Sequence, residues 1–199
     1  MTRSAAASRR PEDIALLLRA IGYALAAADG VTPDLLSRPT PCQGWDLRML
    51  LRHANESLAA LLEAVGSGSV GAFPSAEDLT ADPAATFRDR ARRLADACTR
   101  TARRPRGGRL IVIADRALAL NAVACLGALE IALHGWDISR ACGTRRPIPR
   151  ALAADLLAIA PLLVAEDGRH PLFASPVTPV PTASPSDRLA AFLGRDPRA

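Results

Sequence analysis

The chain has 199 residues, a formal net charge of +5, and a composition that is 49% apolar but only 4% aromatic. This length favours one domain, or one domain with an appendage, and the apolar content is ample for a buried core. Because Ala and Leu dominate the apolar set and lead the helix propensity scale, the composition favours a mainly helical fold.

The basic residues argue against a nucleic-acid partner. All 25 of them are arginines, a bias typical of GC-rich genomes such as those of actinobacteria. Two arginine clusters, Arg88–Arg93 and Arg100–Arg109, could contact phosphates. Neither cluster contains an aromatic side chain that could stack on a base, so a solvated helix face and a basic loop explain them better.

The sequence also favours a cytoplasmic protein without a membrane span. Its start, "MTRSAAASRRPED", lacks the apolar core of a signal peptide, and its four cysteines show no C-x-x-C spacing. The most apolar segment, Leu118–Leu133, is interrupted by Asn121 and Glu130. We expect reduced cysteines that act as small core residues.

Apolar periodicity and helix-capping signals predict five long helices and a short terminal one. Asp46 and Asp82 are suited to cap the second and third helices at their N-termini. The predicted helices span about Pro11–Asp29, Leu47–Val65, Pro83–Arg104, Asp115–Cys142 and Pro149–Glu166, and the short one spans Ser186–Gly194.

Strand signals are weak, so the predicted architecture is an all-α antiparallel four-helix bundle with a C-terminal addition. Only "RLIVIA" and the proline-restricted "FASPVTPVP" could form strands, and "GSGSVGAFPSAED" is typical of a flexible connection. We expect residues 1–168 to form the bundle. Residues 169–199 would be a proline-rich extension, with a short terminal helix, that packs on the bundle.

Polar residues interrupt the fourth predicted helix where Ala and Leu would suffice. Glu130 and His134 are four residues apart, which places both side chains on one helix face. Leu126, Ile131 and Leu133 lie nearby, so we expect this face to be largely buried. A buried carboxylate needs a cation, a hydrogen-bond donor or a metal ion.

His53 supplies a possible third ligand from the second predicted helix. It borders the apolar stripe of that helix, and a bundle would bring it near Glu130 and His134. Two imidazoles and a carboxylate form an open metal site with room for water or substrate. The alternative is an ordinary surface pair of Glu130 and His134. The third histidine, His170, precedes Pro171 in a loop and is expected at the surface.

Three motifs, taken in order, resemble one known family. They are "SRPTPCQGWDLRMLLRHA", "ALEIALHGWDISRACG" and the C-terminal "SPSDRLAAFLGRDP". The sequence resembles the metal-binding family of mycothiol-dependent maleylpyruvate isomerase, within the DinB/YfiT-like helical-bundle superfamily. The resemblance implies that His53, Glu130 and His134 bind a divalent metal, with zinc expected and nickel as the alternative.

The resemblance also implies a thiol-dependent isomerase or transferase that acts on a small electrophile. The low-molecular-weight thiol would be mycothiol or bacillithiol, bound to the metal as thiolate. An acidic substrate could be held by arginine, for which Arg52 and Arg140 are candidates. The short "GRDP" tail stands where the isomerase has a separate domain, which favours a substrate other than maleylpyruvate.

Three neighbouring residues have less certain roles at the sequence level. Asp137 follows His134 by three positions and could orient its imidazole or lie at the helix edge. Trp45 and Trp136 are expected to pack at the end of the bundle rather than stack on substrate.

Two alternative functions remain open from the sequence alone. One is a thiol-independent, metal-dependent isomerase, cyclase or hydrolase of actinobacterial specialised metabolism. The other is a bundle that binds a metal or ligand without catalysis. In each case we expect a monomer or homodimer.

Overall fold

The computed structural model describes residues 13–71, 82–103, 110–113, 116–164, 169 and 173–198. Four long helices dominate these residues, so the predicted mainly helical class is confirmed. Their bounds are Asp13–Ala28 for α1, Leu47–Gly66 for α2, Pro83–Ala102 for α3 and Leu120–Ala141 for α4.

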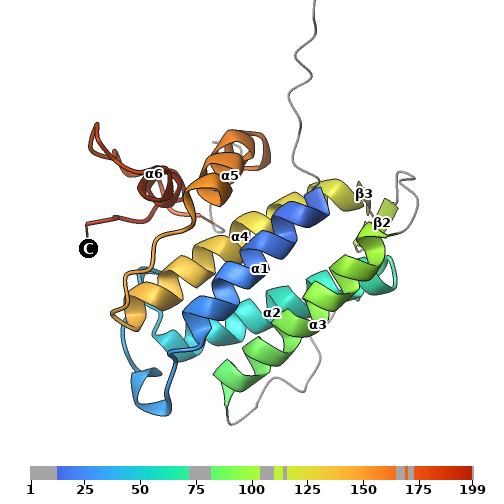
Figure 1. Ribbon diagram of the computed structural model, residues 1–199, viewed down its shortest axis with the longest axis horizontal. Helices are drawn as coiled ribbons and strands as arrows, with labels where there is room; N and C mark the ends of the chain where they lie inside the picture. Colours follow the sequence, from blue (N-terminus) through green and yellow to red (C-terminus); the bar gives the residue numbers. More distant parts are fainter. Residues whose placement is uncertain are drawn as a thin grey trace, which may run out of the picture.

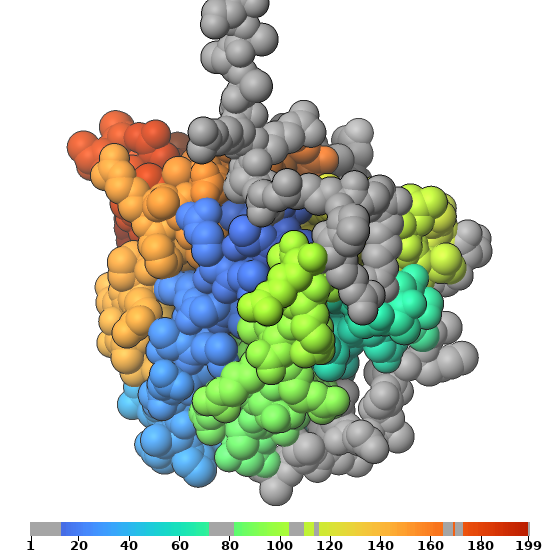
Figure 2. All heavy atoms as spheres, turned by 45° about the vertical axis from the view of Figure 1, so that its right-hand side comes forward, coloured from blue at the N-terminus to red at the C-terminus, as the bar shows by residue number. Residues whose placement is uncertain are grey.

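The four helices form a bundle in which one pair runs opposite to the other (Figure 1). Helix α1 packs against α4 and α3, and α2 packs against the same two helices. The starts of α1 and α4 meet where the Cys125 thiol donates to Asp13 Oδ1 over 3.2 Å. Figure 2 shows α1 and α3 side by side on one face. The predicted DinB-like bundle is therefore confirmed.

Helix caps start the second and third helices as the sequence predicted. The Asp46 side chain accepts a hydrogen bond from the amide of Met49, and Asp82 accepts from the amides of Ala84 and Ala85. Each carboxylate satisfies amides that the first helical turn leaves without a partner. A short 3-10 helix, η1 (Pro33–Leu35), lies in the connection between α1 and α2.

Helix α4 is the core helix of the bundle, and two glycines allow its close contacts. A Cβ atom at Gly127 would lie 2.6 Å from Leu61 Cδ2 of α2. One at Gly135 would lie 2.9 Å from the Ala24 Cα atom of α1. Both distances are shorter than any normal contact. The Leu61 side chain could move aside, but the Ala24 backbone could not, so the crossing of α4 with α1 requires glycine at position 135.

The sequence analysis predicted no membrane span. Helix α4 nevertheless meets the length and hydropathy criteria for one. In the fold, 72% of the qualifying window is buried. The core helix of a soluble protein meets the same criteria, because it too is apolar on most sides.

A small sheet closes one end of the bundle and corrects the predicted start of α4. Strand β2 (Leu110–Ile113) matches the weak strand prediction, and its Ile111 is fully buried. It pairs in parallel with β1 (Ser69–Val70) and antiparallel with β3 (Arg116–Ala119). Helix α4 therefore begins at Leu120 rather than Asp115, because backbone pairing with β2 outweighs the local helix propensity.

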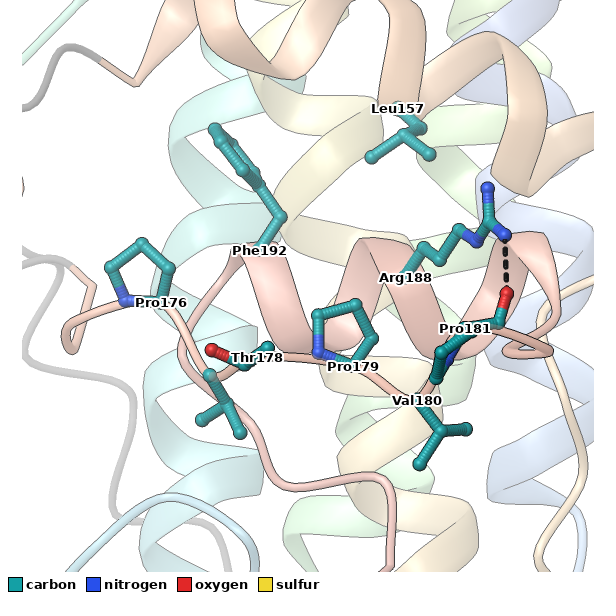
Figure 3. A pocket seen from close by; sticks show the side chains of 9 residues that line it. Leu157, Pro176, Thr178, Pro179, Val180, Pro181, Arg188 and Phe192 are labelled. Atoms are coloured by element: carbon teal, nitrogen blue, oxygen red, sulfur yellow. Dashed lines mark hydrogen bonds between the residues drawn. The ribbon is translucent and has the colours of Figure 1, made fainter.

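The C-terminal part adds two helices that pack on each other, α5 (Arg150–Leu163) and α6 (Pro185–Phe192). Residues 173–181 contain no strand, because prolines remove the amide donors that a sheet requires. Between α5, this segment and α6 lies a groove of about 500 Å³, lined by Leu157, Phe192 and several prolines (Figure 3).

We expect Gly135→Ala to destabilise the protein by about 1–3 kcal/mol, because the added methyl group would push α1 away from α4. Gly22→Ala is the matched control. Gly22 lies exposed in α1 with open space around it, so alanine should stabilise the protein by about 0.5–1 kcal/mol. Urea denaturation measures both, and equal effects would contradict the close α1–α4 crossing.

Candidate metal centre

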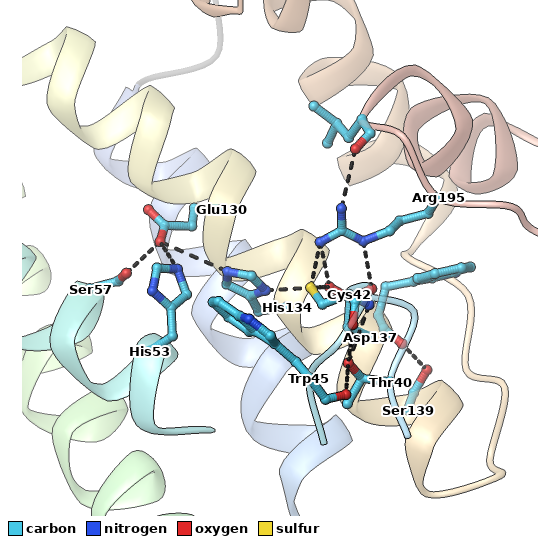
Figure 4. Close-up of polar contacts among 12 residues, drawn as sticks. Thr40, Cys42, Trp45, His53, Ser57, Glu130, His134, Asp137, Ser139 and Arg195 are labelled. Atoms are coloured by element: carbon cyan, nitrogen blue, oxygen red, sulfur yellow. Dashed lines mark hydrogen bonds and ion pairs between the residues drawn. The ribbon is translucent and has the colours of Figure 1, made fainter. Parts of the chain in front are cut away.

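The structure brings together the three side chains that the sequence pattern selected (Figure 4). His53 extends from α2, and Glu130 and His134 extend from α4. Glu130 Oε1 lies 3.3 Å from His53 Nε2 and 3.9 Å from His134 Nε2. One ligand atom of each residue lies within 4.8 Å of the other two. Three donor atoms thus converge on one small volume.

The imidazole rings are held edge to face. The centroids of His53 and His134 are 5.1 Å apart at an interplanar angle of 86°. His53 also meets the half-buried Trp45, with centroids 5.0 Å apart at 63°. Trp136 is 2% exposed and packs in the core. Both tryptophans therefore serve packing, but Trp45 packs directly against a site residue.

One side of this cluster is open to solvent. The His53 and Glu130 side chains are 37% and 27% exposed, whereas His134 is 8% exposed. Leu126, which was expected to help bury Glu130, is instead 39% exposed. That expectation was wrong because Leu61 packs onto Gly127, so α4 turns Gly127 rather than Leu126 toward α2. A small molecule can therefore reach the cluster.

Charge pairing dominates the electrostatics of the open cluster. The hydrogen bond to Glu130 raises the pKa of His53, although partial burial opposes this shift. Burial favours the neutral form of Glu130, but His53, His134 and Ser57 outweigh it and hold its pKa below the usual value. The carboxylate is therefore ionised and available as a metal ligand at neutral pH.

Ser57 is a site residue that the sequence analysis missed. It lies one helical turn after His53, and its hydroxyl donates to Glu130 Oε1. This bond fixes the carboxylate orientation from α2, the helix opposite Glu130. The spacing of four residues from His53 was the only signal in the sequence.

Asp137 lies behind His134, on the side away from the open cluster. Its Oδ2 atom is 3.3 Å from His134 Nδ1, and the residue is fully buried. Of the two sequence-based interpretations, the geometry favours orientation of the imidazole over a place at the helix edge. In the neutral imidazole, a proton on Nδ1 shared with Asp137 leaves the Nε2 lone pair facing Glu130.

Arg195 and Cys42 complete the buried side, and neither was selected from the sequence. Arg195 Nε donates to Asp137 Oδ1 over 3.1 Å, and Nη2 donates to Oδ2 over 3.0 Å. Nη2 also lies 2.8 Å from Cys42 Sγ. Burial and the Asp137 carboxylate raise the pKa of the Cys42 thiol to about 12, so it stays protonated. The signals were "PTPCQGWD" and "GRDP", in which these two residues lie.

A second group of potential metal ligands consists of Cys42, His134 and Asp137. The Arg195 guanidinium already contacts two of these three residues. A metal ion there would have to displace this cation and repel it at short range. The open group of His53, Glu130 and His134 is thus the better candidate for a metal ion.

The arginine candidates are not part of this ligand group, and the third histidine lies outside the described residues. The Arg140 guanidinium stacks 4.6 Å above the Trp136 ring and donates to the Pro197 carbonyl over 2.7 Å. Arg140 thereby ties α4 to the C-terminal part. Arg52 is exposed on α2. His170 lies outside the described residues.

A family model described as the mycothiol maleylpyruvate isomerase N-terminal domain matches residues 17–139. The chain belongs to this family. The matched region covers more than half of the chain and includes the open cluster and Asp137, but it ends before α5 and Arg195. Searches of curated proteins and of solved structures found no match.

We expect Asp137→Asn to lower the free energy of unfolding by about 3 kcal/mol, because it leaves a buried guanidinium without its counter-ion. The pKa of Asp137 is held below its usual value, since His134 and Arg195 outweigh the effect of burial. The stabilisation is thus present above about pH 4 and is lost as the pH falls through the lowered pKa.

Asp196→Asn is the control for this change, because Asp196 forms an exposed pair with Arg198. It should leave the urea midpoint at neutral pH almost unchanged. A similar midpoint for both variants would show that the Asp137–Arg195 pair contributes little to stability.

Proposed function

We propose that this protein binds a divalent metal ion through His53, Glu130 and His134 and uses it with a low-molecular-weight thiol on a small electrophilic substrate. One observation carries the proposal: Glu130 Oε1 faces the Nε2 atoms of both histidines on a side open to solvent. Membership of the mycothiol maleylpyruvate isomerase N-terminal domain family supports the thiol.

The donor set suits zinc better than the hard cations. Two imidazole nitrogens and one carboxylate oxygen are typical of catalytic zinc sites, whereas magnesium and calcium prefer oxygen ligands only. Nickel accepts the same ligands and is the alternative. Three protein ligands leave a coordination position for a substrate or thiol.

Each residue around this coordination position has a distinct proposed role. His53 and His134 donate nitrogen lone pairs, and Glu130 supplies the negative charge that favours a dication. Ser57 fixes Glu130, and Asp137 fixes His134 from behind. Trp45 packs edge to face against His53 and restricts the movement of its ring. When bound, a divalent metal lowers the pKa of a coordinated thiol or water.

The proposed reaction is addition of the thiolate sulfur to a conjugated double bond of the substrate, whose π electron pair moves onto the conjugated carbonyl. In an isomerisation, rotation about the resulting single bond follows; the electron pair then returns, the double bond forms again and the thiolate leaves. In a transfer, the proton released by the thiol adds to the adjacent carbon, and the thioether is the product. For an acidic substrate, Arg52 is the better candidate contact, because Arg140 is engaged by Trp136 and Pro197.

Three further expectations accompany this proposal. The protein would act in the cytoplasm, as a monomer or homodimer, without a nucleic-acid or membrane partner. Residues 1–168 would be the metal-binding bundle, and residues 169–199 its C-terminal extension.

The metal site is tested by elemental analysis after reconstitution with zinc or nickel. The purified protein should hold about one metal ion per chain, and His134→Ala should hold less than about a tenth, because it removes one of three protein ligands. Glu130→Gln and His53→Ala should lose metal similarly.

Asp89→Asn is the matched control, because Asp89 lies exposed on α3 and pairs only weakly with Arg93 over 3.7 Å. It should keep the full metal content. Less than about a tenth of an equivalent in the unaltered protein would overturn both the thiol-dependent and the thiol-independent metal enzyme.

Thiol dependence has a test of its own. We expect incubation with mycothiol and a panel of electrophiles, including conjugated acids, to give isomerised products or thioether adducts in mass spectrometry. Product formation should require both the thiol and the metal, and should fail with Glu130→Gln. A metal-loaded protein that turns over the panel without thiol would instead be a thiol-independent isomerase, cyclase or hydrolase.

A further inference from the structure

Arg195 belongs to the C-terminal segment, yet it is buried against the polar residues of α4. The residue is 7% exposed, and two of its nitrogens donate to the two oxygens of Asp137 over 3.1 and 3.0 Å. A guanidinium that pairs with both carboxylate oxygens fixes the plane of the carboxylate as well as its charge. Arg195 therefore fixes the orientation of the Asp137 carboxylate relative to the residues around it.

The backbone conformation before Arg195 is tightly constrained. At the end of α6 the amide of Gly194 donates to Ala191 and that of Arg195 donates to Ala190, which is a Schellman motif. Gly194 has a φ of 82°, and a Cβ atom there would lie 2.7 Å from the Ala174 carbonyl oxygen. The helix end and the segment beside it thus set the direction of the Arg195 side chain.

The chain of contacts continues from Arg195 through Asp137 to His134. Asp137 is fully buried, where an isolated carboxylate would be costly and would tend to bind a proton. The Arg195 guanidinium offsets this cost and keeps Asp137 as an acceptor. Asp137 Oδ2 can then accept from His134 Nδ1, 3.3 Å away, and in the neutral imidazole this places the Nε2 lone pair toward Glu130.

We propose that Arg195 is a positioning residue for the metal centre, which acts through Asp137 to fix the tautomer and ring orientation of His134. This inference rests on the proposed function, since it assigns His134 Nε2 to the metal. It makes docking of the C-terminal segment part of the site. Metal binding and docking of this segment are therefore coupled, and each favours the other.

A role in attachment alone would not require this geometry. Arg140 already ties α4 to the C-terminal segment through the Pro197 carbonyl. Arg195, by contrast, directs two nitrogens to Asp137, the carboxylate that contacts His134 on its Nδ1 side. The inference therefore predicts effects on His134 that loss of an attachment point would not produce.

The first test reads the His134 tautomer by imidazole nitrogen NMR in metal-free protein. The chain has three histidines, so the signals can be assigned by single substitutions. We expect a proton on Nδ1 of His134 in the unaltered protein and a mixture of tautomers in Arg195→Gln. This readout stays informative even if the protein binds no metal, an outcome that would overturn the proposed function separately.

The second test measures zinc affinity by competition with a chelator. Arg195→Gln should weaken binding about tenfold or more, as is typical when a residue that orients a ligand is lost. Arg195→Lys keeps the charge without the planar fork and should recover part of the affinity. Arg198→Gln is the control, because Arg198 is exposed and, among the described residues, its guanidinium pairs with Asp196.

The inference is overturned if Arg195→Gln matches Arg198→Gln in both zinc affinity and His134 tautomer. If Arg195→Gln does not fold, Arg195→Lys decides the question. Binding at least about threefold weaker than in Arg198→Gln supports the inference, and equal binding overturns it.

Discussion

The ion pair between Asp137 and Arg195 is the interaction on which the polar interior of this protein depends. Asp137 is fully buried on the core helix of the bundle, where its charge is tolerated only beside a cation and a hydrogen-bond donor. Arg195 supplies the cation from a segment 58 positions away in the sequence. The pair joins α4 to the C-terminal part. It also holds in place the Asp137 carboxylate, which contacts His134 Nδ1 on the buried side of the ring.

His134 separates two chemically different regions. Behind it, Asp137, Cys42 and Arg195 form a closed group in which every charge has a partner within about 3 Å. In front of it, His53 and Glu130 face solvent with donor atoms that converge. The closed group holds a cation supplied by the chain itself, whereas the open group contains none and is the group for which we propose a metal ion. This division explains why only one of two adjacent ligand clusters suits a metal ion.

Much of the candidate site could be predicted because helix geometry is local. Glu130 and His134 share a face at a spacing of four residues, and the capping residues Asp46 and Asp82 mark helix starts without tertiary information. The start of α4 was placed five residues too early, because Arg116–Ala119 pairs with β2. Helix propensity depends only on residues near in sequence, so it contains no information about a partner strand.

The sequence by itself determined the helical class and the main helices, and it selected His53, Glu130 and His134 as candidate ligands, since these follow from periodicity, capping and residue chemistry. Only the tertiary structure decided that Ser57 binds Glu130, that Leu126 is exposed and that Cys42 and Arg195 meet Asp137. The physical reason is that these contacts join separate elements. Their geometry depends on how the helices cross, which is set by close contacts such as that of Gly135 with Ala24.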